Sequence, residues 1–279
     1  MTQSGRLNHP RAAWAAAVVG DKIVVVGGQA DGKLVAQSEV FDGERWRDVA
    51  EIPTRRDHLG AASDGRYLYA VGGRELSQDK NVRALERYDP VSDSWKTLES
   101  MPTASGSVGA AYVGGRLITV GGESPTSASD AVQGYDIQKQ AWSQLPKLPS
   151  ARHGVAVTVL NDSLYAVGGA AVPGHYDSTN DAAVLNLSDT PAVPTTADPD
   201  WRDIRDAPFP RQYAASTAVR GRVLLVGGIA KGESASAKTA VYDPAFNNWT
   251  PGPQLPMAPP PRGRGTPSRR RRTGASAGG

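Results

Sequence analysis

The sequence predicts an all-β chain in which one four-stranded unit is repeated around a ring. An apolar run ending in Gly-Gly occurs five times, with glycine pairs that begin at positions 27, 72, 121, 168 and 227. An aromatic–Asp pair follows in four copies and a Trp in all five. Successive copies are 45, 49, 47 and 59 residues apart. A period of about 40 to 50 residues is typical of a propeller, with a solenoid as the alternative.

The composition agrees with short strands joined by turns. The chain has 31 Gly and 21 Pro among 279 residues, and both residue types favour turns. It has no Cys, which excludes disulfides, thiolate metal sites and thiol nucleophiles. No signal-like segment and no apolar stretch of about 18 residues is apparent. From these features we expect a cytoplasmic protein without a membrane partner.

Each copy divides into four predicted strands. The first is small and apolar, as at 60–62 and 155–157. The second runs into Gly-Gly without alternation, as expected of a strand covered on both faces. The third contains the aromatic–Asp pair and the fourth begins near the Trp. These markers are 41–42, 88–89, 135–136 and 242–243 for the pair, and Trp46, Trp95, Trp142, Trp201 and Trp249.

A proline precedes each new copy, and in three of the four junctions an arginine stands three residues after it, with Arg11 in the same place before the first copy. Copy three has Ser105 where the arginine is due, and copy four has the sequence of 186–189 in place of Tyr-Asp. The prolines are Pro53, Pro102, Pro149, Pro208 and Pro256, and the arginines are Arg11, Arg56, Arg152 and Arg211.

This constellation over residues 9–256 resembles the Kelch repeat family, which combines Gly-Gly, Tyr-Asp, Trp, Pro and Arg in this order. The resemblance implies a β-propeller of four-stranded antiparallel blades, most often six. It also implies a binding module in most cases and an enzyme scaffold in some. Only five motifs are present here. The expected repeats are about 9–53, 54–102, 103–149, 150–208 and 209–256, after a lead-in at 1–8.

The segment 257–279 departs from the pattern just where a sixth copy should begin. It contains six arginines and no acid, and without it the net charge falls from +3 to −3. We expect a disordered tail rich in Arg, Pro and Gly. It could be the product of a frameshift or truncation, the tail of a true five-bladed ring, or a phosphate-binding arm. The tail has no interleaved aromatic residues to stack bases, which counts against a nucleic-acid arm. We expect no nucleic-acid partner except through this basic tail.

The strand order places the junction arginines on the same face as the Gly-Gly turns, near the mouth of the ring. Converging guanidiniums would bind carboxylate or phosphate groups. In Kelch modules that capture acidic peptides, arginines at matching positions do the binding, with Ser105 as a neutral replacement here. The alternative is that each arginine serves only its own repeat. The expected ligand residues are Arg11, Arg56, Arg152, Arg211 and Ser105.

Copy four contains two insertions, at 170–181 and 188–200. The first is a loop between the second and third strands, and it should project beside the mouth. Loops on rigid scaffolds commonly carry recognition. His175, Tyr176 and Asp177 are therefore further candidates for ligand binding.

The sequence predicts no catalysis, cofactor or metal site. Its four His form no metal-ligand pair, and no nucleophile or nucleotide motif is present. The copper oxidases on Kelch-like propellers need a cysteine, and the iron-binding pattern of plant specifier proteins is absent. One enzymatic alternative is a sugar-acid mutarotase, with Arg56 and Asp57, or Arg152 and Glu123, in the mouth. The primary prediction is a non-catalytic module that binds a protein, an acidic peptide or a small anion.

Overall fold

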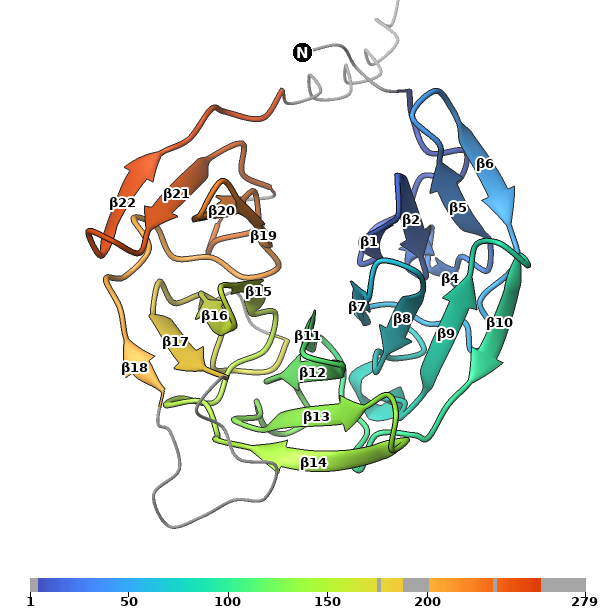
Figure 1. Cartoon of the computed structure of the whole chain (residues 1–279), viewed down its shortest axis with the longest axis horizontal. Coiled ribbons are helices and arrows are strands. Elements are labelled where there is room, and N and C mark those ends of the chain that lie inside the picture. Colours follow the sequence, from blue (N-terminus) through green and yellow to red (C-terminus); the bar gives the residue numbers. More distant parts are fainter. Residues whose placement is uncertain (1–4, 175–176, 188–200, 233–234, 257–279) are drawn as a thin grey trace, which may run out of the picture.

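A computed structural model of the chain describes residues 5–174, 177–187, 201–232 and 235–256. Five antiparallel four-stranded sheets follow one another around a central axis, which makes an all-β propeller (Figure 1). Blades 1 and 5 face each other across an open sector of this ring (Figure 1). The predicted fold class is therefore confirmed, with five blades.

Within each blade the strands lie side by side in chain order, with the first nearest the axis (Figure 1). Blade 1 contains β1 (Ala15–Val19), β2 (Lys22–Val26), β5 (Ser38–Phe41) and β6 (Trp46–Val49). Blade 2 contains β7 (Gly60–Ser63), β8 (Leu68–Val71), β9 (Leu85–Asp89) and β10 (Ser94–Thr97). Blade 3 contains β11 (Gly109–Val113), β12 (Arg116–Val120), β13 (Val132–Asp136) and β14 (Ala141–Leu145).

Blades 4 and 5 follow the same pattern. Blade 4 contains β15 (Ala156–Leu160), β16 (Ser163–Val167), β17 (Ala182–Asn186) and β18 (Arg202–Asp203). Blade 5 contains β19 (Ala215–Val219), β20 (Arg222–Val226), β21 (Thr239–Asp243) and β22 (Asn248–Pro251). Between the second and third strands, blade 1 carries the hairpin β3 (Gln29–Ala30) and β4 (Lys33–Leu34), and blade 2 carries the short 3-10 helix η1 (Gln78–Lys80).

The core lies between neighbouring blades. All four residues of β8 are buried, as the continuous apolar run predicts for a strand sandwiched on both faces. Four buried apolar clusters join blades 1 and 2, 2 and 3, 3 and 4, and 4 and 5. Among the residues that the structure describes, no such cluster joins blade 5 to blade 1.

The Gly-Gly turns connect each blade to the next. The second glycine donates its backbone N–H to the carbonyl at the junction position of the following blade, as Gly122 does to Arg152 at 2.9 Å. A Cβ added to Gly121, whose φ is +64°, would stand 2.2 Å from the same carbonyl oxygen. Only glycine therefore suits both the left-handed backbone and the close approach.

The Trp side chains connect each blade to the one before it. In blades 1, 2, 3 and 5 the Trp ring packs against the aromatic residue of the same blade, at 5.2 Å between centroids for Tyr88 and Trp95. The indole N–H of Trp95 donates to the carbonyl of Ala50 in blade 1 at 3.0 Å. Equivalent bonds are made by Trp142, Trp201 and Trp249.

The pairing register refines one sequence expectation. Leu164 of β16 pairs with Leu185, in the register that Leu68 has with Tyr88 in blade 2. Leu185-Asn186 is therefore the structural counterpart of Tyr-Asp in blade 4, whereas the sequence pattern pointed to 186–189. The tail at 257–279, the loop at 188–200 and the first four residues lie outside the described residues.

Candidate functional site

The junctions and the Gly-Gly turns meet on one face of the ring, which we call the mouth face. An isolated bridge in every blade joins the residue after the junction position to the residue after Gly-Gly. This pairing places ten residues around the mouth, two from each blade, and all except Gly106 have a side chain. The bridges are Ala12–Gln29, Asp57–Arg74, Gly106–Glu123, His153–Ala170 and Gln212–Ile229.

The residue after the first member of each bridge belongs to a series of backbone hydrogen bonds that runs from blade to blade, which we call the belt. The belt residues all have φ between +52° and +60°, and each of the last four donates its N–H to the carbonyl of the preceding one at 2.7–2.9 Å. Positive φ is uncommon outside glycine, and its recurrence at one position indicates that these hydrogen bonds hold it. The belt residues are Ala13, His58, Ser107, Gly154 and Tyr213.

Glu123 is the centre of a polar cluster on this face, although its side chain is only 1% exposed. Its carboxylate accepts hydrogen bonds from Ser107 Oγ at 2.7 Å, Gln78 Nε2 at 2.8 Å and Arg74 Nη1 at 3.0 Å. The backbone N–H of Gly174 adds a contact of 3.2 Å from the loop of blade 4. A buried carboxylate needs such donors because it has left water.

Arg74 links Glu123 to blade 2. Its Nη2 lies 3.0 Å from His58 Nε2, and its Nε lies 3.7 Å from Asp57 Oδ1. Asp57 is fully buried and accepts a 2.5 Å hydrogen bond from Gln29 Nε2 of blade 1. Arg74 is thus held between two carboxylates from neighbouring blades.

Tyr213 extends the cluster to blades 4 and 5. Its hydroxyl lies 3.2 Å from Ser107 Oγ and 3.3 Å from His153 Nδ1. His153 Nδ1 also lies 3.7 Å from Glu123 Oε2, and its Nε2 lies 3.0 Å from the carbonyl oxygen of Val172. Carboxylate, imidazole and phenol groups, the types that serve as general acids and bases, therefore lie together in one cluster.

The cluster differs in charge from the arginine-lined mouth that the sequence suggested. It contains one guanidinium and two carboxylates, so its formal charge is −1 with both histidines neutral. Such a cluster can donate and accept hydrogen bonds, and Arg74 is its guanidinium group.

The junction arginines of blades 1 and 2 point into their own blades. Arg56 is fully buried, and its guanidinium donates to Gly72 O at 2.7 Å, Ala70 O at 3.1 Å and Glu86 at 2.5 Å. Burial lowers the pKa of Arg56, and the attraction of Glu86 opposes that shift. Arg11 makes the same type of pair with Glu39 at 2.5 Å. This geometry supports the structural alternative for both arginines, since their donors are already engaged.

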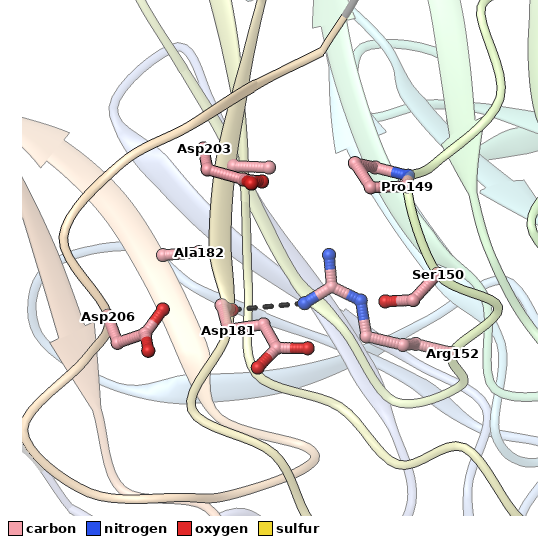
Figure 2. Close-up of a pocket in the computed structure, with 8 residues that line it drawn as sticks. Pro149, Ser150, Arg152, Asp181, Ala182, Asp203 and Asp206 are labelled. Atoms are coloured by element: carbon pink, nitrogen blue, oxygen red, sulfur yellow. Dashed lines mark hydrogen bonds between the residues drawn. The ribbon is translucent and has the colours of Figure 1, made fainter.

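The other predicted residues have varied environments. Ser105 is buried beside Gly106, and Arg211 stacks on the ring of Phe209 with its guanidinium carbon 3.7 Å from the ring centroid. Arg152 lines a cavity of about 320 Å³ between the junction segment at 149–152 and the strands β17 and β18 of blade 4 (Figure 2). Asp177 is exposed and pairs with Lys231 at 2.7 Å. His175 and Tyr176 lie outside the described residues.

The two arginine–carboxylate pairs considered for a mutarotase do not form. Arg56 pairs with Glu86, while Asp57 is buried beside Arg74. Glu123 pairs with Arg74 and not with Arg152. The sequence did contain a signal for these residues. Arg74 and Glu123 directly follow Gly-Gly, at a position whose residue type changes in every copy.

A family model described as the KLHDC2/KLHL20/DRC7 Kelch-repeats domain matches residues 107–270, and the Kelch motif model matches 55–102. The chain belongs to the Kelch-repeat family. Its propeller is similar to the structure of YjhT, with a TM-score of 0.72 and 15% identity over 89% of this chain and 85% of that chain.

Curated relatives match this Kelch propeller over short segments. Kelch-like protein 41b of Danio rerio is 34% identical over 87 residues, which are 30% of this chain and 14% of that protein. The F-box/kelch-repeat protein At1g16250 of Arabidopsis thaliana is 36% identical over 50 residues, which are 18% and 13% of the two chains. In the described part of this chain, no helix has the length and apolar character needed to cross a membrane.

Proposed function

We propose that this Kelch propeller is a non-catalytic binding module whose mouth face binds a protein segment that carries carboxylates. The observation that carries the proposal is the contrast between repeated and varied positions. Gly-Gly, Trp and the belt repeat in every blade, whereas the ten mouth positions differ from blade to blade. A scaffold that repeats while its surface varies is suited to selective recognition.

Exposed apolar side chains support a protein as the ligand. Trp14, Leu76 and Val172 are 44%, 41% and 44% exposed, and they come from the mouth-face segments of blades 1, 2 and 4. Large apolar side chains surrounded by polar groups are typical of protein–protein interfaces. Arg74, whose side chain is 14% exposed, would supply the attraction for a carboxylate.

A peptide selection tests this proposal. Peptides selected for binding to the wild-type propeller should be enriched in Asp or Glu, and Arg74→Gln should weaken their binding about tenfold or more. Val91→Ala is the matched control, because Val91 is 89% exposed in the β9–β10 turn on the opposite face. Equal binding by wild type and the Arg74→Gln variant would contradict the proposal. The cytoplasmic location expected from the sequence stays a prediction.

The Arg74–Glu123 pair also favours a second candidate, the sugar-acid mutarotase. The arginine would hold the sugar carboxylate, and Glu123 with His153 would move the proton between the anomeric hydroxyl and the ring oxygen. Proton NMR of anomer exchange in N-acetylneuraminic acid tests it. Wild type should accelerate exchange and Glu123→Gln should not. A wild-type rate equal to the buffer rate would exclude this activity.

A further inference from the structure

The junction arginine has a repeated partner, and blade 4 lacks it. In blades 1 and 2 the partner is a glutamate on the third strand, Glu39 or Glu86, with side chains at most 2% exposed. In blade 3 both members are neutral, because Ser105 and Gln133 replace them. Blade 4 retains the cation but not the acid.

The strand register identifies the residue that replaces the acid. Ala166 pairs with Ala183 in blade 4 as Ala70 pairs with Glu86 in blade 2. Ala183 therefore occupies the glutamate position opposite Arg152. The side-chain volume that Glu86 fills in blade 2 is vacated in blade 4, and the cavity lies there, with Ala183 in its lining.

The guanidinium of Arg152 is only partly satisfied. Its Nη1 donates to Gly168 O at 3.1 Å and to Asp181 O at 3.0 Å, while its Nε has no partner in the structure. The residue is only 2% exposed. No carboxylate among the described residues forms a direct ion pair with this guanidinium, and Asp181, Asp203 and Asp206 attract it only from a distance. A buried cation without a direct ion pair is costly, so this group is suited to accept a carboxylate from outside the chain.

Blade 5 shows the alternative solution. It also has alanine, Ala240, at the glutamate position. There the ring of Phe209 covers Arg211, and Ser236 Oγ lies 3.4 Å from Nη2. The residue that corresponds to Phe209 in blade 4 is Ser150, which is too small to cover Arg152 and lines the cavity instead.

The rim of the cavity has the opposite charge to its floor. Asp181, Asp203 and Asp206 are exposed and line the opening, and Figure 2 shows Asp203 and Asp206 across the cavity from the guanidinium. The lining therefore carries one positive and three negative charges. A simple dianion such as phosphate would be repelled by the rim, whereas a ligand with both charges would match the site.

We propose that this cavity binds a small zwitterion whose carboxylate takes the place of the missing glutamate on Arg152 and whose ammonium group faces the rim aspartates. The cavity volume of about 320 Å³ accommodates a ligand of amino-acid size. The site lies within blade 4 and is independent of the mouth-face proposal.

Titration with three probes tests the site. Binding is measured by calorimetry and by thermal unfolding of the full-length protein. γ-Aminobutyrate should bind and raise the Tm, acetate should bind more weakly, and phosphate should have no effect on the Tm. Ala183→Glu should abolish the effect of γ-aminobutyrate, because its carboxylate would occupy the site as Glu86 does in blade 2. The matched variant Ala183→Gln fills the same volume without the charge.

Asp206→Asn supplies a second test that does not depend on a buried substitution. It should weaken γ-aminobutyrate about two- to five-fold and leave acetate unweakened, since it removes one exposed charge. The proposal is overturned if no probe raises the Tm of wild type. It is also overturned if γ-aminobutyrate binds equally to wild type, Ala183→Glu and Asp206→Asn.

Discussion

At the scale of single residues, the junction arginine shows how neighbours decide the role of a repeated position. Arg56 and Arg152 occupy equivalent places in the repeat, but one faces a buried glutamate and the other faces a cavity. The structural role follows from charge pairing in the first case. In the second case the loss of the acid leaves a buried cation that can bind a ligand.

Removing one member of the buried Arg56–Glu86 ion pair should destabilise the fold more than removing both. Arg56→Met leaves Glu86 buried without a counter-charge, and we expect it to lower the free energy of unfolding by about 3 to 5 kcal/mol. Urea denaturation measures this loss. The neighbouring Arg55→Met is the control, because Arg55 forms only an exposed pair with Glu51 and should cost about 1 kcal/mol or less. The double variant Arg56→Met/Glu86→Met should recover much of the loss, and failure to do so would contradict charge pairing as the cause.

The aspartate of the aromatic–Asp pair should make stability depend on pH. Asp136 accepts the N–H groups of Gln138 and Lys139 at 3.0 and 2.8 Å, and the bond from Lys139 is the largest cause of its lowered pKa. Because the folded-state pKa lies below the unfolded value of about 3.9, the stabilisation is present above that pH and is lost as pH falls through the folded-state pKa. Asp136→Ala should lower the Tm at about pH 7, and the difference from wild type should shrink at about pH 2.5. A difference that is constant over this range would exclude the carboxylate as its source.

At the scale of elements, the Gly-Gly turn forms a backbone connection between blades that adds to the apolar clusters. The first glycine of each pair adopts positive φ, and in blades 1 to 4 the carbonyl of the next blade closely approaches it. The belt adds a second connection at the start of the first strand. These two backbone contacts explain why the mouth face stays regular while its side chains vary.

A pair of glycine variants should separate backbone strain from close approach. Gly121 and Gly115 both have positive φ, but a Cβ at Gly115 would meet nothing within 4 Å. We expect Gly115→Ala to cost about 1 to 2 kcal/mol from strain alone, and Gly121→Ala to cost at least about 2 kcal/mol more. Chemical denaturation of both variants measures the difference. Equal losses would show that the contact with the Arg152 carbonyl does not constrain the turn.

At the scale of the whole molecule, the five blades form four blade–blade interfaces. Among the described residues, one face of blade 1 and one face of blade 5 have no neighbouring blade. Blade 3 has a neighbour on each side, whereas blade 5 packs against blade 4 alone among the described blades. The exposure of β19 reflects this position, because four of its five residues are exposed, whereas three of the five residues of β15 are buried. Local stability should therefore fall towards the open sector.

Hydrogen exchange should detect this gradient. We expect the amides of β19 and β20 to exchange about tenfold faster or more than those of β11 and β12, because fewer buried contacts oppose their opening. Exchange followed by mass spectrometry, with peptides covering 109–120 and 215–226, measures the ratio. Equal protection of the two segments would mean that another surface covers blade 5.

Much of the architecture could be predicted because its signals are local. Strand placement follows from apolar runs and turn residues, and the period of the Gly-Gly pairs identifies the blades. The predicted arginine mouth shows the limit of this reasoning. The strand order correctly brings the start of each blade to the mouth face, but it does not specify where a long side chain points, and burial of a guanidinium depends on a partner elsewhere in the blade.

The sequence by itself determined the repeat, the strand order and the position of the varied residues beside each Gly-Gly turn, because each of these depends on neighbours within one copy. Only the tertiary structure decided which of these residues meet. Arg74 and Glu123 are 49 residues apart and belong to different blades, yet the curvature of the ring brings their side chains to 3.0 Å. The cavity at Arg152 likewise depends on the strand register, which places Ala183 at the glutamate position. The physical reason is that packing between blades sets these distances, and no single repeat contains both partners.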